Sequence, residues 1–133
     1  MRGVLAVLLL AGLVAGCGTP SPDLFVVDRS GPDRNANVEL LVNDGGSVTC
    51  NGKKHPLDAD RLLKARQLER DLEPQAELGI QLPKGPGTDL SYTVRMEGGT
   101  IAFSDRSSGV PNTFQRLAAF TKDVTERVCG LER

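Results

Sequence analysis

The sequence predicts an α+β domain in which an antiparallel sheet of four to five strands carries two helices on one face, in the order ββα-ββα. Two runs of alternating apolar and polar residues are each interrupted by a glycine turn, which is typical of β-hairpins. Apolar residues at helical spacing follow each run. The turn Asp44-Gly45-Gly46-Ser47-Val48 also matches Glu97-Gly98-Gly99-Thr100-Ile101, which suggests one ββα unit used twice. Because neither unit can bury its apolar face alone, the two are expected to share one core.

Three strands are predicted before the first helix. A short β-rich run at residues 24–27 leads into the turn-forming stretch Ser30-Gly31-Pro32-Asp33, and residues 25–29 add a fifth strand to the sheet. The alternating apolar residues of Val38–Asn43 predict a half-buried strand. The stretch Ser47-Val48-Thr49-Cys50 returns as its partner through the glycine turn.

The first helix is predicted to begin after Asp58, whose carboxylate is a good N-cap. Leu57 precedes this cap at the spacing of a hydrophobic staple. The apolar stripe of the helix consists of Leu62, Ala65, Leu68 and Leu72. Pro74 predicts its end or a kink. The segment from Gly79 to Gly87 contains several prolines and glycines, so it predicts an exposed connection with a short extended piece at residues 80–82.

The second half of the chain repeats the pattern of the first. Leu90, Tyr92, Val94 and Met96 alternate with polar residues, and the return strand begins with Ile101 after the second glycine turn. Pro111 suits the first position of a helix. Apolar residues then recur at helical spacing, and the final helix is predicted to run from about Pro111 to Cys129.

Composition narrows the classes of function. The 133 residues allow one domain at most, and 16 Lys and Arg against 17 Asp and Glu leave a net charge of −1. Nucleic-acid binding is therefore not expected. With one histidine and three cysteines, no catalytic residue, no metal site and no cofactor is assigned, and the protein is predicted not to be an enzyme. His55, in the run Lys53-Lys54-His55-Pro56, is interpreted as a solvated turn histidine.

The N-terminal residues have the pattern of an export signal. Arg2 gives a positive start, and the apolar run from Val4 to Ala15 is shorter than the roughly 20 helical residues that span a bilayer. The sequence Val14-Ala15-Gly16-Cys17 resembles the lipobox of bacterial lipoproteins. This resemblance implies a diacylglycerol on the sulfur of Cys17 and cleavage between Gly16 and Cys17. The alternatives are an ordinary secretory signal with a chance cysteine, or a buried helix of a cytosolic domain.

The lipobox predicts the organisation and the location of the protein. Residues 1–16 are the signal peptide, residues 17–23 the lipidated cysteine and a spacer, and residues 24–133 a single α+β domain. The protein is expected to be anchored in the cell membrane by acyl chains such as palmitate, facing the extracytoplasmic side. Its partners are the membrane, through the lipid, and an envelope protein or protease. The predicted role is non-enzymatic binding at the cell envelope, and the ligand and oligomeric state are left open.

The two remaining cysteines predict a disulfide bond. With Cys17 acylated, Cys50 and Cys129 have only each other as partners, and export favours an oxidised pair. The chain-entropy model assigns roughly 4–5 kcal/mol to a bridge that closes so long a loop. Two unrelated buried thiols are the alternative. A thiol-redox role is not expected, because no Cys-x-x-Cys pair is present.

The predicted domain also resembles the small emfourin-type domains. The resemblance rests on the Leu-x-Tyr-x-Val strand from Leu90, the strand end Phe103-Ser104-Asp105 and Pro111 before the last helix, with Arg29-Ser30-Gly31 and Leu57-Asp58 in the first half. Some members of that group inhibit thermolysin-like metalloproteases, which implies protease inhibition as the alternative function. The candidate inhibitory loops are Arg29 to Arg34 and Gly79 to Gly87, and no individual inhibitory residue is assigned.

Overall fold

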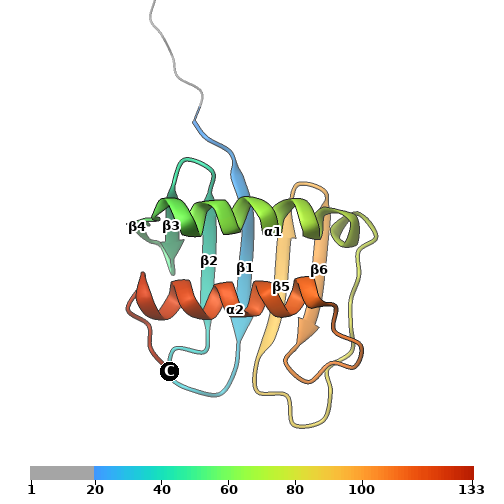
Figure 1. Ribbon diagram of the computed structural model, residues 1–133. Helices are drawn as coiled ribbons and strands as arrows, with labels where there is room; N and C mark the ends of the chain where they lie inside the picture. The colour runs from blue at the N-terminus through green and yellow to red at the C-terminus, as the bar shows by residue number, and fades with distance from the viewer. Residues whose placement is uncertain (1–19) are drawn as a thin grey trace, which may run out of the picture.

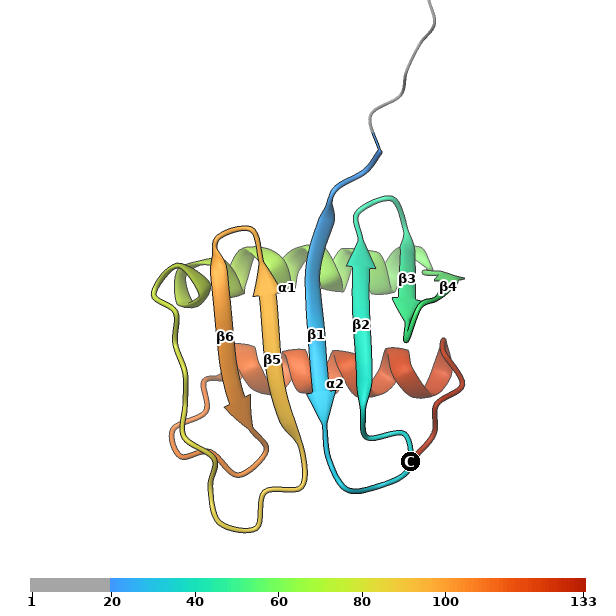
Figure 2. The same ribbon diagram turned by 180° about the vertical axis from the view of Figure 1, so that it is seen from behind.

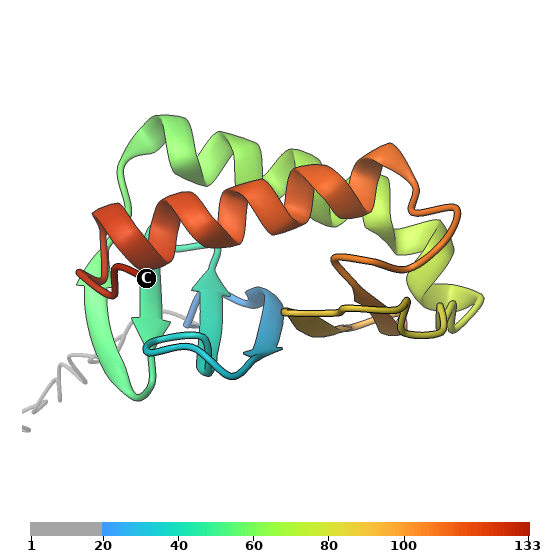
Figure 3. The same cartoon turned by 90° about the horizontal axis from the view of Figure 1, so that it is seen from below.

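The computed structural model describes residues 20–133, which form a six-stranded antiparallel sheet and two helices in the order ββββαββα. The strands are β1 Asp23–Ser30, β2 Val38–Asn43, β3 Ser47–Cys50, β4 Lys53–Pro56, β5 Ser91–Met96 and β6 Gly99–Ser104. The helices are α1 Ala59–Glu77 and α2 Asn112–Arg127. Both helices cover the same face of the sheet (Figures 1 and 3). The predicted α+β class and the two helices on one face are confirmed. The predicted order ββα-ββα and the four to five strands are wrong, because four strands precede α1 and the sheet has six.

The first strand lies in the middle of the sheet, whose order is β4-β3-β2-β1-β5-β6 (Figure 2). Val27 of β1 pairs with Leu40 of β2 on one side and with Val94 of β5 on the other. The strand that the sequence offered as a fifth member therefore joins the two predicted hairpins. Because β1 has ladders on both sides, the two halves of the chain share one sheet and one core.

The core lies between the sheet and the helices and follows the predicted alternation. The fully buried side chains include Phe25, Val27, Leu40, Val42, Val48, Val94, Ile101, Leu72, Phe114, Leu117 and Val124. The Phe103 ring of β6 lies between Tyr92, with ring centroids 4.8 Å apart, and Phe114 of α2, at 5.0 Å. Nearer the other end of α2, Phe120 contacts Phe25 of β1 edge to face. Helix α2 thus packs on strands from both halves of the chain.

Strand β4 differs from the basic turn that the sequence predicts for these residues. It pairs with β3 through the turn at Asn51 and Gly52, which have φ values of 49° and 84°. Positive φ at both central residues is the requirement of the type I′ hairpin turn, for which Asn-Gly is the favoured pair. Lys53–Pro56 forms the edge of the sheet, and its charged residues and proline discourage pairing with a further strand. An edge strand of this composition carries little apolar alternation.

Helix α1 begins as predicted, with Asp58 accepting a hydrogen bond from the Arg61 N–H at 3.0 Å. Of the two outcomes predicted at Pro74, an end or a kink, the end is wrong, because the helix continues to Glu77. Its last turn is closed by Gly79 at φ 61°, with bonds from the Gly79 N–H to the Ala76 carbonyl and from the Ile80 N–H to the Gln75 carbonyl. The second glycine turn packs against this last turn of α1, since a Cβ on Gly99 would clash with the Ala76 carbonyl.

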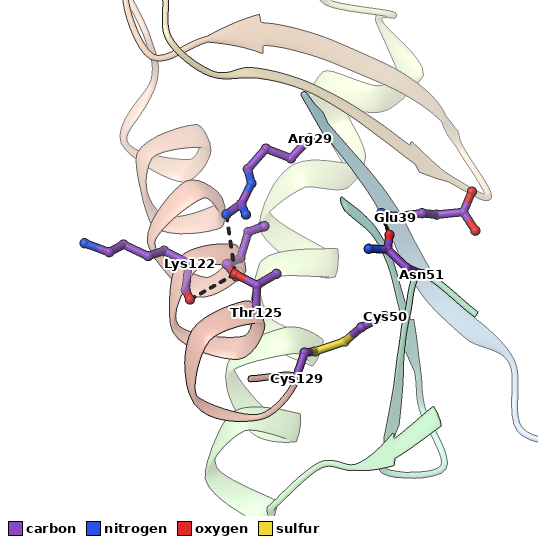
Figure 4. The surroundings of a disulfide bond; sticks show 8 residues. Arg29, Glu39, Cys50, Asn51, Lys122, Thr125 and Cys129 are labelled. Atoms are coloured by element: carbon purple, nitrogen blue, oxygen red, sulfur yellow. Dashed lines mark hydrogen bonds between the residues drawn. A yellow bond between two sulfur atoms is a disulfide. The ribbon is translucent and has the colours of Figure 1, made fainter. Parts of the chain in front are cut away.

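The predicted disulfide between Cys50 and Cys129 is present. It joins the end of β3 to the segment after α2, with the two Cα atoms 6.2 Å apart and the residues separated by 79 positions in sequence (Figure 4). Helix α2 begins one residue after Pro111 and ends at Arg127 rather than Cys129. The Cys129 N–H still donates to the Val124 carbonyl at 3.0 Å, so the second cysteine is fixed directly to the end of the helix.

We expect the double variant Cys50→Ser with Cys129→Ser to lower the thermal midpoint of unfolding by more than about 10 °C. The bond restricts the unfolded chain over a long loop and holds α2 against β3. Thermal unfolding followed by circular dichroism measures the change. A midpoint equal to that of the parent protein would show that the bond has no structural importance. Alkylated thiols at both Cys50 and Cys129 in non-reduced protein would show that the bond does not form.

Candidate functional site

Arg29 is a charged side chain buried in the core, with 3% of its surface exposed. It lies on the helix-facing side of β1 and points toward α2 (Figure 4). Its Nε donates to the Ala36 carbonyl at 2.9 Å, and its Nη2 donates to the Asn35 carbonyl at 2.8 Å. Its Nη1 donates to Thr125 Oγ1 at 3.4 Å. Arg29 thereby fastens the β1–β2 connection to the last turns of α2.

The charge of Arg29 is compensated by dipoles. Between Pro20 and Arg133, no carboxylate lies within ion-pair distance of the guanidinium. Burial lowers the pKa of Arg29 from its ordinary value, while Tyr92 and Glu126 act in the opposite direction. The two loop carbonyls and the negative end of the α2 dipole favour the cation. Each of the three guanidinium nitrogens has a hydrogen-bond partner within the domain, which points to a structural role for this residue.

His55 lies beside the cysteine pair. It is opposite Val48 in the β3–β4 ladder, so its side chain belongs to the helix-facing side of the sheet together with Cys50. The ligand atoms of Cys50, His55 and Cys129 all lie within 4.8 Å of one another. His55 is half-buried in a strand, so its interpretation as a solvated turn histidine is wrong. Sequence spacing did not show this cluster, because its members come from three separate elements.

Parts of both predicted inhibitory loops are buried in the domain or hydrogen-bonded to it. In the first, Arg29 is buried and Gly31 is half-buried, whereas Ser30, Pro32, Asp33 and Arg34 are exposed. In the second, residues 80–82 form the predicted extended piece: the Leu82 N–H donates to the Ala102 carbonyl at 2.8 Å, and the Ala102 N–H donates to the Ile80 carbonyl at 3.0 Å. This piece covers the outer edge of β6. The part from Pro83 to Gly87 continues to the far end of the domain (Figure 1).

Three connections meet at the end of the domain opposite the start of β1, and we call residues 31–37, 83–90 and 105–111 the distal loops (Figure 2). Ser107 Oγ donates to the Pro83 carbonyl at 2.7 Å. Asp105 accepts from the Asp89 N–H at 3.2 Å, and Thr88 Oγ1 shares a hydrogen bond with Ser104 Oγ at 3.0 Å. The second and third distal loops are therefore held together as one ordered, exposed surface.

A groove of about 610 Å³ lies between the two helices. Its floor is apolar, with Leu68 and Phe120, and ion pairs between the helices lie beside it. Arg61 of α1 contacts Asp123 of α2 at 2.8 Å, and Arg116 contacts Asp71 at 2.7 Å. The hydrogen bond from Arg61 lowers the pKa of the Asp123 carboxyl. These pairs join α1 to α2, so their charges are already matched within the domain.

No protein-family model, curated protein or solved structure matches this chain. The likeness to lipoproteins and to emfourin-type domains thus remains a prediction from the sequence. The signal peptide, the lipobox and Cys17 lie outside the described residues 20–133. Within that range, no helix is long and apolar enough to cross a membrane. The assignment of a function therefore depends on the geometry of the domain and on the sequence before it.

We expect Arg29→Lys to lower the free energy of unfolding by about 2 kcal/mol, because a lysine ammonium cannot reproduce the fork that reaches both loop carbonyls and Thr125. Chemical denaturation measures the loss. Arg95→Lys is the matched control: Arg95 forms ion pairs with Asp28 and Glu39 on the exposed side of the sheet, where a change below about 0.5 kcal/mol is expected. Equal effects of the two substitutions would contradict a special role for the buried guanidinium.

Proposed function

We propose that this chain is a lipid-anchored protein of the extracytoplasmic membrane surface, and that its distal loops bind another component of the cell envelope. The lipobox ending at Cys17 supports the anchor. The chain enters the domain at the end of the sheet opposite the distal loops, and this position is the observation that carries the proposal (Figure 1). With a lipid on Cys17, the start of β1 faces the membrane and the distal loops face away from it.

The entry of the chain into the domain is fixed by hydrogen bonds. Asn43 Nδ2 donates to the Ser21 carbonyl at 2.8 Å, and the Asp44 N–H donates to the Pro22 carbonyl at 2.9 Å. Asp23 already belongs to β1, so the end of the predicted spacer at residues 17–23 is part of the folded domain. A short, fixed connection of this kind supports one preferred orientation of the domain on the membrane.

Binding by the distal loops is supported by their order and their exposure. Hydrogen bonds join two of the loops before any partner arrives, which reduces the entropy lost on association. Lys84 and Arg106 are exposed there, and Gly85 lies directly against the Arg106 backbone. The proposed role is non-enzymatic, because the only histidine of the chain lies beside an oxidised cysteine pair, which offers no thiolate nucleophile.

We expect Cys17→Ser to remove the protein from the membrane fraction or to leave its precursor uncut, because the side chain that accepts the lipid is lost. Fractionation with detergent partitioning, together with the mass of the intact protein, measures both outcomes. The variant with serine at positions 50 and 129 is the control and stays with the membrane. If Cys17→Ser leaves both the mass and the partitioning unchanged, the anchor is not on this residue.

Charge reversal at the distal loops tests the binding surface. The full-length protein is used to capture components of detergent-solubilised envelope. We expect Lys84→Glu with Arg106→Glu to reduce the recovered partner at least about tenfold, because both substitutions reverse the charge of an exposed side chain on the proposed surface. Lys64→Glu with Lys122→Glu, at exposed positions of α1 and α2 outside the distal loops, is the matched control and retains it. Equal capture by both variants would exclude the distal loops. Capture of a protease that loses activity when bound would instead identify the inhibitory alternative.

A further inference from the structure

The cysteine pair and His55 form a compact set of potential metal ligands. Cys50 comes from β3, His55 from β4, and Cys129 from the segment after α2. Their ligand atoms lie within 4.8 Å of one another. In a tetrahedral zinc site, bond lengths of about 2.3 Å to sulfur and about 2.0 Å to nitrogen place the ligand atoms about 3.6–3.8 Å apart. Opening the bond between the two sulfurs and a small rotation of the side chains reach these separations.

We propose that reduction of the Cys50–Cys129 disulfide creates a zinc site formed by Cys50, His55 and Cys129. Two thiolates and one imidazole are ligands that Zn²⁺ prefers, and water completes the tetrahedron. The oxidised protein lacks this site, because both sulfurs are used in the bond to each other. The pair is then a redox-controlled metal site in addition to a structural bond, and this inference does not depend on the proposed binding function.

The backbone around each ligand is held by contacts other than the disulfide. Cys50 lies in the ladder between Leu40 of β2 and Lys53 of β4. Immediately after it, Asn51 accepts from the Glu39 N–H at 2.8 Å and its own N–H donates to the Glu39 carbonyl at 2.9 Å. Cys129 is fixed to the end of α2 through the Val124 carbonyl. The three ligands therefore remain neighbours when the sulfur–sulfur bond opens.

Reduction of the Cys50–Cys129 disulfide requires two electrons and two protons, which a dithiol can supply. A dithiol reductant attacks one sulfur of the disulfide, passes through a mixed disulfide and leaves as its own disulfide, so that two electrons and two protons reach Cys50 and Cys129. Cys129 is half-buried whereas Cys50 is 4% exposed, which makes Cys129 the more accessible sulfur. On binding Zn²⁺, each thiol releases one proton to solvent. The bound metal keeps both sulfurs as thiolate ligands and so opposes reoxidation.

The test uses the full-length chain in detergent with Cys17→Ser, so that Cys50 and Cys129 are the only thiols. Reduced and oxidised protein are titrated with Zn²⁺ against a chromophoric chelator. Co²⁺ is then used to detect thiolate coordination by its charge-transfer absorption. We expect one Zn²⁺ per chain in the reduced protein and none in the oxidised protein. His55→Ala in the same background should weaken the affinity tenfold or more, whereas Lys54→Ala, at the neighbouring exposed position, should leave it unchanged.

Circular dichroism of the reduced protein separates metal binding from folding. A reduced domain that unfolds and then refolds on adding Zn²⁺ supports the site, because the metal binds the folded arrangement. A reduced domain that binds no Zn²⁺, folded or unfolded, overturns the proposal. If the oxidised protein binds Zn²⁺ as tightly as the reduced protein, the two thiolates are not ligands and the proposal is overturned. If His55→Ala binds Zn²⁺ as tightly as the parent protein, the imidazole is not a ligand and the proposal is overturned as well.

Discussion

The packing of α2 across the whole sheet is the constraint on which the rest of the structure depends. Near its start, Phe114 contacts the Phe103 ring of β6, and further along Phe120 contacts Phe25 of β1. Beyond its end, Cys129 is bonded to Cys50 of β3. One helix thus joins strands from both halves of the chain. Because β1 pairs with β5 as well as with β2, the central strand and this helix hold both halves of the chain around one core.

Arg29 shows how the position of α2 is made specific. An apolar side chain at this place in β1 could fill the same volume, but only a guanidinium reaches two carbonyls of the first distal loop and Thr125 of the helix at once. Burial of the charge has an energetic cost, and the hydrogen bonds offset it. The end of β1, the loop after it and the end of α2 are therefore placed relative to one another by a single side chain.

Local patterns in the sequence predict most of the helices and strands. The rest of the fold depends on contacts between segments that are distant in the sequence. The strands with clear alternation, the Asp58 cap and the apolar stripes of both helices were predicted because each depends on residues a few positions apart. The central place of β1 depends on pairing with β5, far along the chain, and no local pattern encodes it. Strand β4 lacks alternation, although the Asn51-Gly52 dipeptide is a signal for the hairpin that produces it. Because this segment lacks alternation, the sequence predicts a turn at His55 and does not show that His55 lies close to the cysteines.

The link between α2 and β3 has the same partners in both redox states. In the oxidised protein the disulfide provides it and restricts the unfolded chain. In the proposed reduced state a zinc ion would join the same segments through Cys50 and Cys129 and add β4 through His55. A ligand that binds only the folded chain stabilises it in proportion to the logarithm of its concentration. The stability lost on reduction is then recovered to an extent set by the free zinc concentration, so the stability of this corner of the domain depends jointly on the redox state and on the metal.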